Sequence, residues 1–193
     1  MNNATVKTVL FVGVGGQGII LASDVLSEVM MRAGYDVKKS EVHGMAQRGG
    51  CVSSHVRFGE KVYSPLPKKG IVDILVSFER METLRYLDYL NESSSVIVND
   101  EELYPPSVNL GEEPYPENIT ALVKDTFKTV KMLKATEMAH SAGDRRMANT
   151  VMLGALSSLS DVKEDLWKEV LQDALPEKLV KKNLEAFEMG RKA

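Results

Sequence analysis

Thiol and imidazole groups are scarce in this sequence. Its 193 residues include one cysteine, Cys51, and three histidines. A disulfide needs two thiols and an iron–sulfur cluster is normally held by four, so the chain alone can form neither. The histidines, His43, His55 and His140, lack the HxxxH or HExxH spacing that sets two imidazoles on one helix face. We therefore expect no metal site in this chain by itself.

Long apolar runs and an excess of one charge are also missing. No apolar stretch reaches the roughly 18 residues of a membrane span, and residues 1–5 are polar and show no signal-peptide pattern. The formal net charge is −3, with lysines and glutamates interspersed, which gives no electrostatic footprint for nucleic acid or an anionic membrane. The sequence predicts a cytoplasmic protein with neither kind of partner.

What is present is an alternation of strand-like and helix-like segments. The expected strands cover residues 6–12, 35–42, 51–58, 71–78, 96–98 and 130–133, and the expected helices cover residues 19–33, 81–90, 144–159, 166–175 and 179–187. The first and second expected strands should pair in parallel, and the first expected helix should form the right-handed crossover between them. This length suits one domain, residues 1–193. We predict an α/β, three-layer Rossmann-like domain with a mostly parallel sheet and C-terminal helices.

Two segments should depart from simple alternation. Gly59 and Glu60 separate residues 56–58 from residues 61–63, which is the two-residue loop spacing of a type II′ turn. We therefore expect an inserted β-hairpin here. Residues 101–118 contain four prolines and many acids, which is typical of a surface loop.

A glycine-rich turn follows the first expected strand. Its candidate cofactor-binding residues, in a GxGxxG pattern, are Gly13, Gly15, Gly16, Gln17 and Gly18. Such glycines let a backbone approach a ligand, and the free N–H groups of the next helix favour an anion. A dinucleotide site also needs an acid about 20 residues on, and Glu41 fits that spacing. The other interpretation is that the glycines only permit a tight turn and close packing.

A second glycine-rich segment ends the second expected strand. Because ligands bind beyond the carboxyl ends of parallel strands, we expect this segment to border one crevice with the first turn. Its candidate residues are Glu41, His43, Gly44, Gln47, Arg48, Gly49 and Gly50. Arg48 suits a phosphate or carboxylate, or else forms a surface salt bridge. His43 is a candidate base or a hydrogen-bonding element, and Cys51 is a candidate nucleophile or a buried small thiol. We assign no catalytic residue.

Several motifs in this order resemble the gamma component of 2-oxoacid:ferredoxin oxidoreductases. They are GVGGQG at 13–18, SEVHGMAQRGG at 40–50, SPL at 64–66, DILVSFE at 73–79 and NTVMLGA at 149–155. The form HGMAQRGG most resembles the beta subunit of indolepyruvate ferredoxin oxidoreductase. The departures are Cys51, where a small residue such as serine is common, and Arg80, where proline is frequent.

The resemblance implies a heteromeric complex. In that complex, thiamine diphosphate with magnesium decarboxylates a 2-oxoacid, 4Fe-4S clusters pass electrons to ferredoxin, and coenzyme A takes the acyl group. This chain would be the non-cluster subunit, inactive alone, and coenzyme A could lie near its glycine turn. Gly143-Asp144 is followed by Arg145-Arg146 rather than a diphosphate-anchoring asparagine pair. The alternatives are a stand-alone Rossmann-type protein that binds NAD, flavin or ATP, and a ligand-free scaffold.

Overall fold

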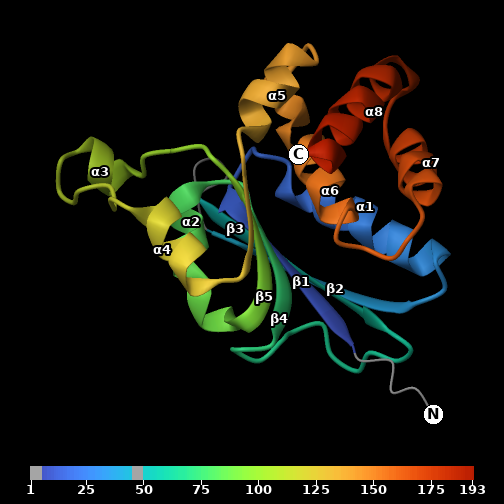
Figure 1. The fold of residues 1–193 in the computed structure, drawn as a ribbon, viewed down its shortest axis with the longest axis horizontal. Coiled ribbons are helices and arrows are strands. Elements are labelled where there is room, and N and C mark those ends of the chain that lie inside the picture. The colour runs from blue at the N-terminus through green and yellow to red at the C-terminus, as the bar shows by residue number, and fades with distance from the viewer. Residues whose placement is uncertain (1–5, 45–49) are drawn as a thin grey trace.

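The computed structural model describes residues 6–44 and 50–193, which form a six-stranded sheet covered by helices on both faces (Figure 1). The strands are β1 (Lys7–Val14), β2 (Asp36–His43), β3 (Cys51–Gly59), β4 (Val72–Ser77), β5 (Leu90–Asn99) and β6 (Thr129–Leu133). Their order in the sheet is β2-β3-β1-β4-β5-β6. The predicted α/β fold with three layers is confirmed.

The predicted parallel pairing of the first two strands is wrong. β3 lies between β1 and β2 and is antiparallel to both, whereas β1, β4, β5 and β6 pair in parallel. A parallel crossover needs a dozen or more residues. Only residues 44–50 connect β2 to β3, so β3 runs back along β2 from Val52, opposite His43, to Gly59, opposite Asp36.

The hairpin expected around Gly59 and Glu60 does not form, because residues 61–63 contain no strand. Side chains hold this segment instead of a β-ladder. Asp36 Oδ2 accepts a hydrogen bond from Val62 N at 2.9 Å. Arg57 Nη1 donates to the carbonyl oxygen of Ser64 at 2.8 Å. The antiparallel pair that the chain does form is β2 with β3.

Helices cover the sheet unequally. One face carries α1 (Ile19–Arg32), α5 (Ala135–Ser141), α6 (Ala148–Ser157), α7 (Glu164–Ala174) and α8 (Glu177–Lys192), and the other carries α2 (Arg80–Arg85) and α4 (Ile119–Thr126) (Figure 1). A short helix, α3 (Pro106–Asn109), lies in the proline-rich segment, and 3-10 turns cover Leu87–Tyr89 and Arg145–Met147. Within the described ranges no helix combines the length and apolar character needed to cross a bilayer.

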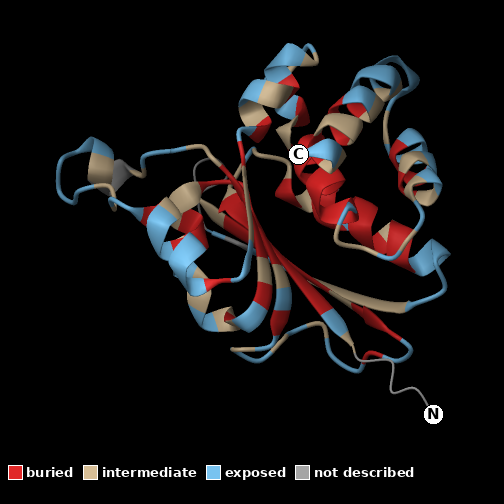
Figure 2. Cartoon of the chain, in the orientation of Figure 1, coloured by how far each residue is buried: buried red, intermediate tan, exposed pale blue. Residues whose placement is uncertain are grey.

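Alternation along β1 separates two apolar cores. Val9 and Phe11 pack beneath α1 and α6, and Leu10 and Val12 pack on the α2 and α4 side. The buried residues accordingly concentrate in the central strands and in α6 (Figure 2).

The crossing of α6 with α8 depends on two glycines. A Cβ atom on Gly154 would lie 2.0 Å from the carbonyl oxygen of Phe187, and one on Gly190 would lie 1.9 Å from that of Val151. Real Cβ atoms essentially never approach another heavy atom this closely. The two helix backbones therefore touch directly, which anchors α8 on the buried α6.

Candidate functional site

The glycine turn joins the carboxyl end of β1 to α1. Gly18 is the N-cap of α1, with a φ of 80°, and no side chain caps this helix end. Left-handed backbone of this kind favours glycine. A Cβ on Gly18 would lie 2.7 Å from Asn149 Nδ2 of α6, and one on Gly13 would lie 2.8 Å from Phe78 Cβ. Both glycines therefore permit close packing. Gly16, with a φ of 105°, has open space where a side chain would be.

Gln17 locks the turn onto the neighbouring strand. Its Oε1 atom accepts a hydrogen bond from Val14 N at 2.7 Å. Its Nε2 atom donates to the carbonyl oxygen of Phe78 at 2.8 Å and to Glu101 Oε2 at 3.2 Å. The Gln17 amide thus positions the turn, and the adjacent backbone faces the open space.

That open space is a cavity of about 310 Å³ at the carboxyl ends of the parallel strands. Its lining residues are Gly15, Gly16, Gln17, Phe78, Asn99, Glu101, Leu103, Thr136, Arg145, Arg146 and Ala148. The cavity lies where the chain leaves β1 toward α1 on one face and leaves β4 toward α2 on the other. Such a switch point is the usual ligand site of an open α/β sheet.

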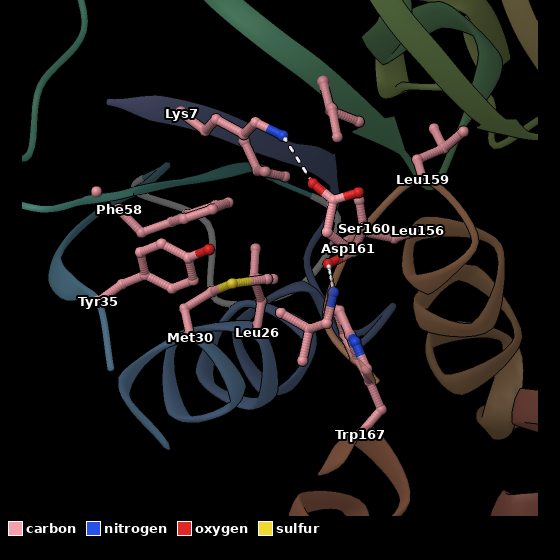
Figure 3. A pocket seen from close by; sticks show the side chains of 14 residues that line it. Lys7, Leu26, Met30, Tyr35, Phe58, Leu156, Leu159, Ser160, Asp161 and Trp167 are labelled. Atoms are coloured by element: carbon pink, nitrogen blue, oxygen red, sulfur yellow. Dashed lines mark hydrogen bonds and ion pairs between the residues drawn. The ribbon is translucent and has the colours of Figure 1, made fainter. Parts of the chain in front are cut away.

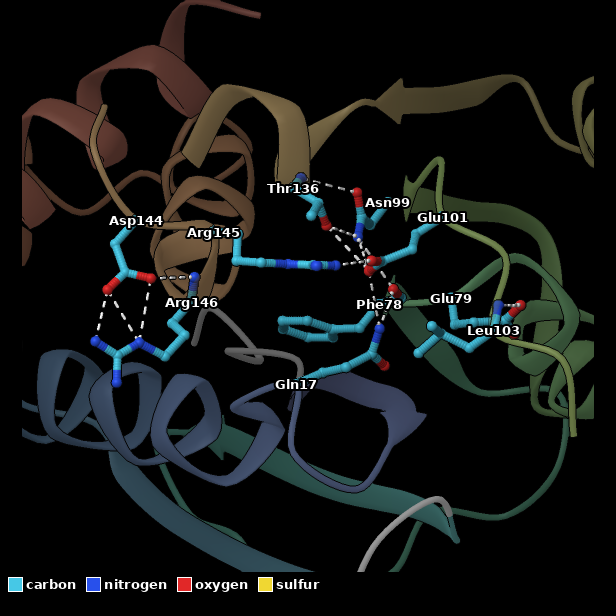
Figure 4. A network of polar contacts seen from close by, with 10 residues as sticks. All are labelled: Gln17, Phe78, Glu79, Asn99, Glu101, Leu103, Thr136, Asp144, Arg145 and Arg146. Carbon is cyan, nitrogen blue, oxygen red and sulfur yellow. Dashed lines mark hydrogen bonds and ion pairs between the residues drawn. The ribbon is translucent and has the colours of Figure 1, made fainter. Parts of the chain in front are cut away.

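Glu101 is the centre of a polar network at this cavity. Its Oε2 atom accepts hydrogen bonds from Asn99 Nδ2 and Thr136 Oγ1, each at 3.0 Å, in addition to the one from Gln17. Arg145 Nη2 lies 3.4 Å from Glu101 Oε1 (Figure 4). Four elements of the chain therefore converge on one carboxylate.

The two arginines at the cavity differ in their availability. Arg146 is held by Asp144, whose carboxylate lies 2.6 Å from Arg146 Nη2. That guanidinium lowers the pKa of Asp144 to about 2, so the pair stays charged at neutral pH. The Arg145 side chain is 68% exposed, and among the described residues its one ion pair is a long contact with Glu101. Of the two described arginines, Arg145 is thus the one whose guanidinium is less engaged by neighbouring side chains.

The second glycine-rich segment is described only at its ends. Gly15 N donates a hydrogen bond to the Gly50 carbonyl oxygen at 2.9 Å, so this end lies against the glycine turn. Gly44 N donates to the Cys51 carbonyl oxygen at 3.0 Å. His43 is the last residue of β2, opposite Val52. Gln47, Arg48 and Gly49 lie outside the described residues.

Glu41 is not next to the glycine turn. It lies on β2 opposite Ser54 of β3 and forms an ion pair with Lys39. Because β3 separates β2 from β1, the acid and the glycine turn are two strands apart. A dinucleotide site needs that acid on the adjacent strand, so the geometry does not favour the stand-alone dinucleotide interpretation.

Cys51 lies beside a buried carboxyl group. Its Sγ atom donates a hydrogen bond to Glu82 Oε1 at 3.3 Å. Burial, followed by the nearby Glu82 charge, raises the pKa of the Cys51 thiol, and burial raises the pKa of Glu82 as well. A nucleophilic cysteine needs a lowered pKa, so this environment favours an inert thiol.

Of the residues that meet at Glu101, sequence reasoning named Gln17 as a site residue but missed Asn99, Thr136, Arg145 and Glu101 itself. Asn99 ends β5, Glu101 follows it, and Thr136 and Arg145 come after β6. Their position just beyond strand ends was the available signal. No three histidine, cysteine or acidic side chains in the described ranges are grouped to hold a metal ion.

Comparison with known proteins extends this description. The pyruvate ferredoxin/flavodoxin oxidoreductase family matches residues 8–193. Indolepyruvate oxidoreductase subunit IorB of Thermococcus kodakarensis is 39% identical over 190 residues, covering 96% of this chain and 94% of that protein.

Two solved structures share the fold. The gamma subunit of a keto/oxoacid ferredoxin oxidoreductase from Geobacter sulfurreducens superposes with a TM-score of 0.71 at 24% identity, covering 96% of each chain. The 2-oxoglutarate:ferredoxin oxidoreductase of Magnetococcus marinus gives a TM-score of 0.76 at 24% identity over 97% of this chain and 30% of the longer one. By its family match and its relatives, the chain belongs to the pyruvate ferredoxin/flavodoxin oxidoreductase family, as a subunit of a 2-oxoacid:ferredoxin oxidoreductase.

Proposed function

We propose that this chain is the non-cluster subunit of an indolepyruvate-type, aryl 2-oxoacid:ferredoxin oxidoreductase. The observation that carries the proposal is the 39% identity to an IorB subunit over nearly its whole length. The single cysteine supports the assignment of a supporting role, because a 4Fe-4S cluster normally needs four thiolates. Thiamine diphosphate, magnesium and the clusters are then held by a large partner subunit in the cytoplasm, which passes electrons to ferredoxin.

The contribution of this chain, in the same proposal, is to bind coenzyme A at the carboxyl end of its sheet. Gly16 offers open backbone, the N-terminus of α1 carries no capping side chain, and Arg145 is a largely exposed cation. Backbone N–H groups and a guanidinium together suit a phosphate. Gln47 and Arg48 of the adjoining segment would add polar contacts. The related Magnetococcus marinus structure contains bound coenzyme A and succinyl-CoA.

Reconstitution tests the subunit assignment. The chain and its co-purifying partner should together reduce ferredoxin when given indolepyruvate and coenzyme A, and the complex should be brown in ultraviolet-visible spectroscopy. The chain alone should give no turnover, because its described residues provide neither a clustered metal site nor a reactive thiol. Turnover by the chain alone would refute the assignment, and so would a partner without clusters.

Calorimetric titration of the complex with coenzyme A tests the proposed site. Arg145→Ala and Arg48→Ala should each weaken affinity about tenfold, because each removes a charge-assisted contact to phosphate. Arg32→Ala is the matched control, since Arg32 pairs with Glu28 and Asp173 on the exposed surface at the other end of α1. If all three variants bound coenzyme A with the affinity of the wild type, this site would be excluded.

A further inference from the structure

A second cavity lies at the opposite end of β1 from the glycine turn. It has a volume of about 220 Å³ and lies between α1, the ends of β1 and β3, and the connection from α6 to α7 (Figure 3). The eight residues of β1 separate the two cavities by roughly 25 Å, at about 3.3 Å per residue. The proposed coenzyme A site therefore does not include this cavity.

The cavity walls are mainly apolar and partly aromatic. Leu26 and Met30 of α1 and Leu156 of α6 line it, beside Phe58 at the end of β3. Tyr35 packs edge-on against Phe58, with ring centroids 5.6 Å apart. An engineered dry cavity of about 150 Å³ binds benzene, so this space accommodates one aromatic ring. Aromatic edges and the Met30 thioether both favour such a ring.

Trp167 provides an unused hydrogen-bond donor in this wall. The residue is 0% exposed, and its Nε1 atom has no hydrogen-bond partner among the described residues. Buried indole N–H groups usually have a partner. The indole lies across the cavity from Lys7 (Figure 3). A ligand that carried an acceptor at its inner end would therefore satisfy a group that the protein leaves unpaired.

Lys7 provides a cation on the opposite side. Its Nζ atom lies 3.9 Å from Asp161 Oδ2, and the two side chains are 52% and 96% exposed. An exposed pair at this distance is weak, and Asp161 can turn to solvent. Lys7 is therefore able to meet a ligand carboxylate at the entrance.

We propose that this cavity binds a small aromatic carboxylic acid. The ring lies among Leu26, Met30 and Phe58, the carboxylate contacts Lys7, and a para acceptor receives the hydrogen bond from Trp167. The best probe is 4-hydroxyphenylacetate, which has these three groups on a single ring.

Calorimetric titration of the full chain tests the site, and red-edge fluorescence of Trp167, the only tryptophan, reports its occupancy. We expect saturable binding of 4-hydroxyphenylacetate with a dissociation constant on the order of 0.1 mM, within the usual limits for a ligand of this size. Phenylacetate should bind about fivefold more weakly, and acetate should not bind. If neither 4-hydroxyphenylacetate nor phenylacetate showed saturable binding, the proposal would be overturned.

Variants locate the binding. Lys7→Gln should weaken 4-hydroxyphenylacetate about tenfold and leave benzyl alcohol unaffected, and Trp167→Phe should abolish the preference for the para hydroxyl. Lys61→Gln is the matched control, because Lys61 is 65% exposed and lies 3.7 Å from Asp36. Leu159→Phe enlarges a side chain that lines the cavity and should block binding. Unchanged affinity in Leu159→Phe with an unchanged circular dichroism spectrum would place the ligand elsewhere and overturn the proposal.

Discussion

The turn after β1 and the crossing of α6 with α8 both depend on glycine, but different atoms face the missing side chains. At the turn, a Cβ on Gly18 would meet the amide of Asn149, which can rotate. At the crossing, a Cβ on Gly154 or Gly190 would meet backbone carbonyl oxygens within helices. A helix backbone cannot yield without breaking its own hydrogen bonds. Gly16 and Gly18 of the turn should therefore tolerate a side chain better than Gly154 and Gly190 of the crossing do.

The largest effect should come from the crossing. Gly190→Ala should lower the free energy of unfolding by about 3 kcal/mol or more, because overpacking here displaces a whole helix. Urea unfolding followed by circular dichroism measures it. Glu185→Ala, an exposed position on the same helix, should stay within about 0.5 kcal/mol of the wild type. A loss below about 1 kcal/mol for Gly190→Ala would show that the crossing accommodates a methyl group.

A smaller effect is expected at the N-cap of α1. Gly18→Ala should cost about 2 kcal/mol, partly from the φ of 80° and partly from the contact with Asn149. A double-mutant cycle with Asn149→Ala separates the two causes. The steric part, about 1 kcal/mol, should disappear in the Asn149→Ala background. If this steric cost persisted in the Asn149→Ala background, the Asn149 amide would not be the group that opposes a side chain at Gly18.

Gly16→Ala should be milder still. A Cβ at this position would have no atom within 4 Å, so only the φ of 105° opposes the substitution, at about 1 kcal/mol. The loss in free energy of coenzyme A binding should exceed the loss in free energy of unfolding, because the added methyl group would lie in the proposed binding space. Thermal unfolding and calorimetric titration of the same sample compare the two losses. Unchanged coenzyme A affinity in Gly16→Ala would show that Gly16 does not contact the ligand.

Charge should contribute least, and His55 is the group that tests it. His55 is buried and both of its ring nitrogens lack partners among the described residues, so burial lowers its pKa in the folded state. The unfolded chain then binds the proton first, and stability falls as pH drops below about 6.5. The loss should reach at most about 0.8 kcal/mol at pH 6.0.

The difference between the wild type and His55→Gln isolates this effect, because buried Glu82, whose pKa is raised by burial, titrates in the opposite sense. Urea unfolding at pH 7.5 and 6.0 measures it. The glycine variants should keep the same pH dependence as the wild type. A larger loss of stability between pH 7.5 and pH 6.0 in His55→Gln than in the wild type would reverse the assignment.

Local patterns were sufficient to predict most strands and α1, because alternation and helical periodicity depend on neighbouring residues. They predicted β5 only at residues 96–98, although it spans Leu90–Asn99, and they extended the preceding helix to residue 90, although α2 ends at Arg85. They could not predict which strands lie side by side, since that depends on contacts between distant segments. The connection of residues 44–50, too short for a crossover helix, was the overlooked signal. The short helices α4 and α5 escaped prediction because eight and seven residues carry little periodicity.

The candidate site was predictable in part for the same reason. The glycine turn and its neighbour Gly50 belong to recognisable motifs, and the structure brings them together. Glu41 was placed by a spacing rule that assumes β2 lies next to β1, and the insertion of β3 breaks that assumption. Glu101 and Arg145 belong to no motif, and their meeting depends on the ends of β5 and β6.

The outermost position of β2 also bears on how the chain behaves when its partner is scarce. An exposed strand edge can recruit a strand from another molecule and start aggregation. Here Lys38 pairs with Asp36 at 2.6 Å, and that contact lowers the pKa of Asp36 to about 2, so the acid stays ionised. Lys39 bridges to Asp24 of α1. A strand from another molecule would have to displace these charged side chains and their hydration. The ion pairs therefore protect unassembled copies from fibrous association.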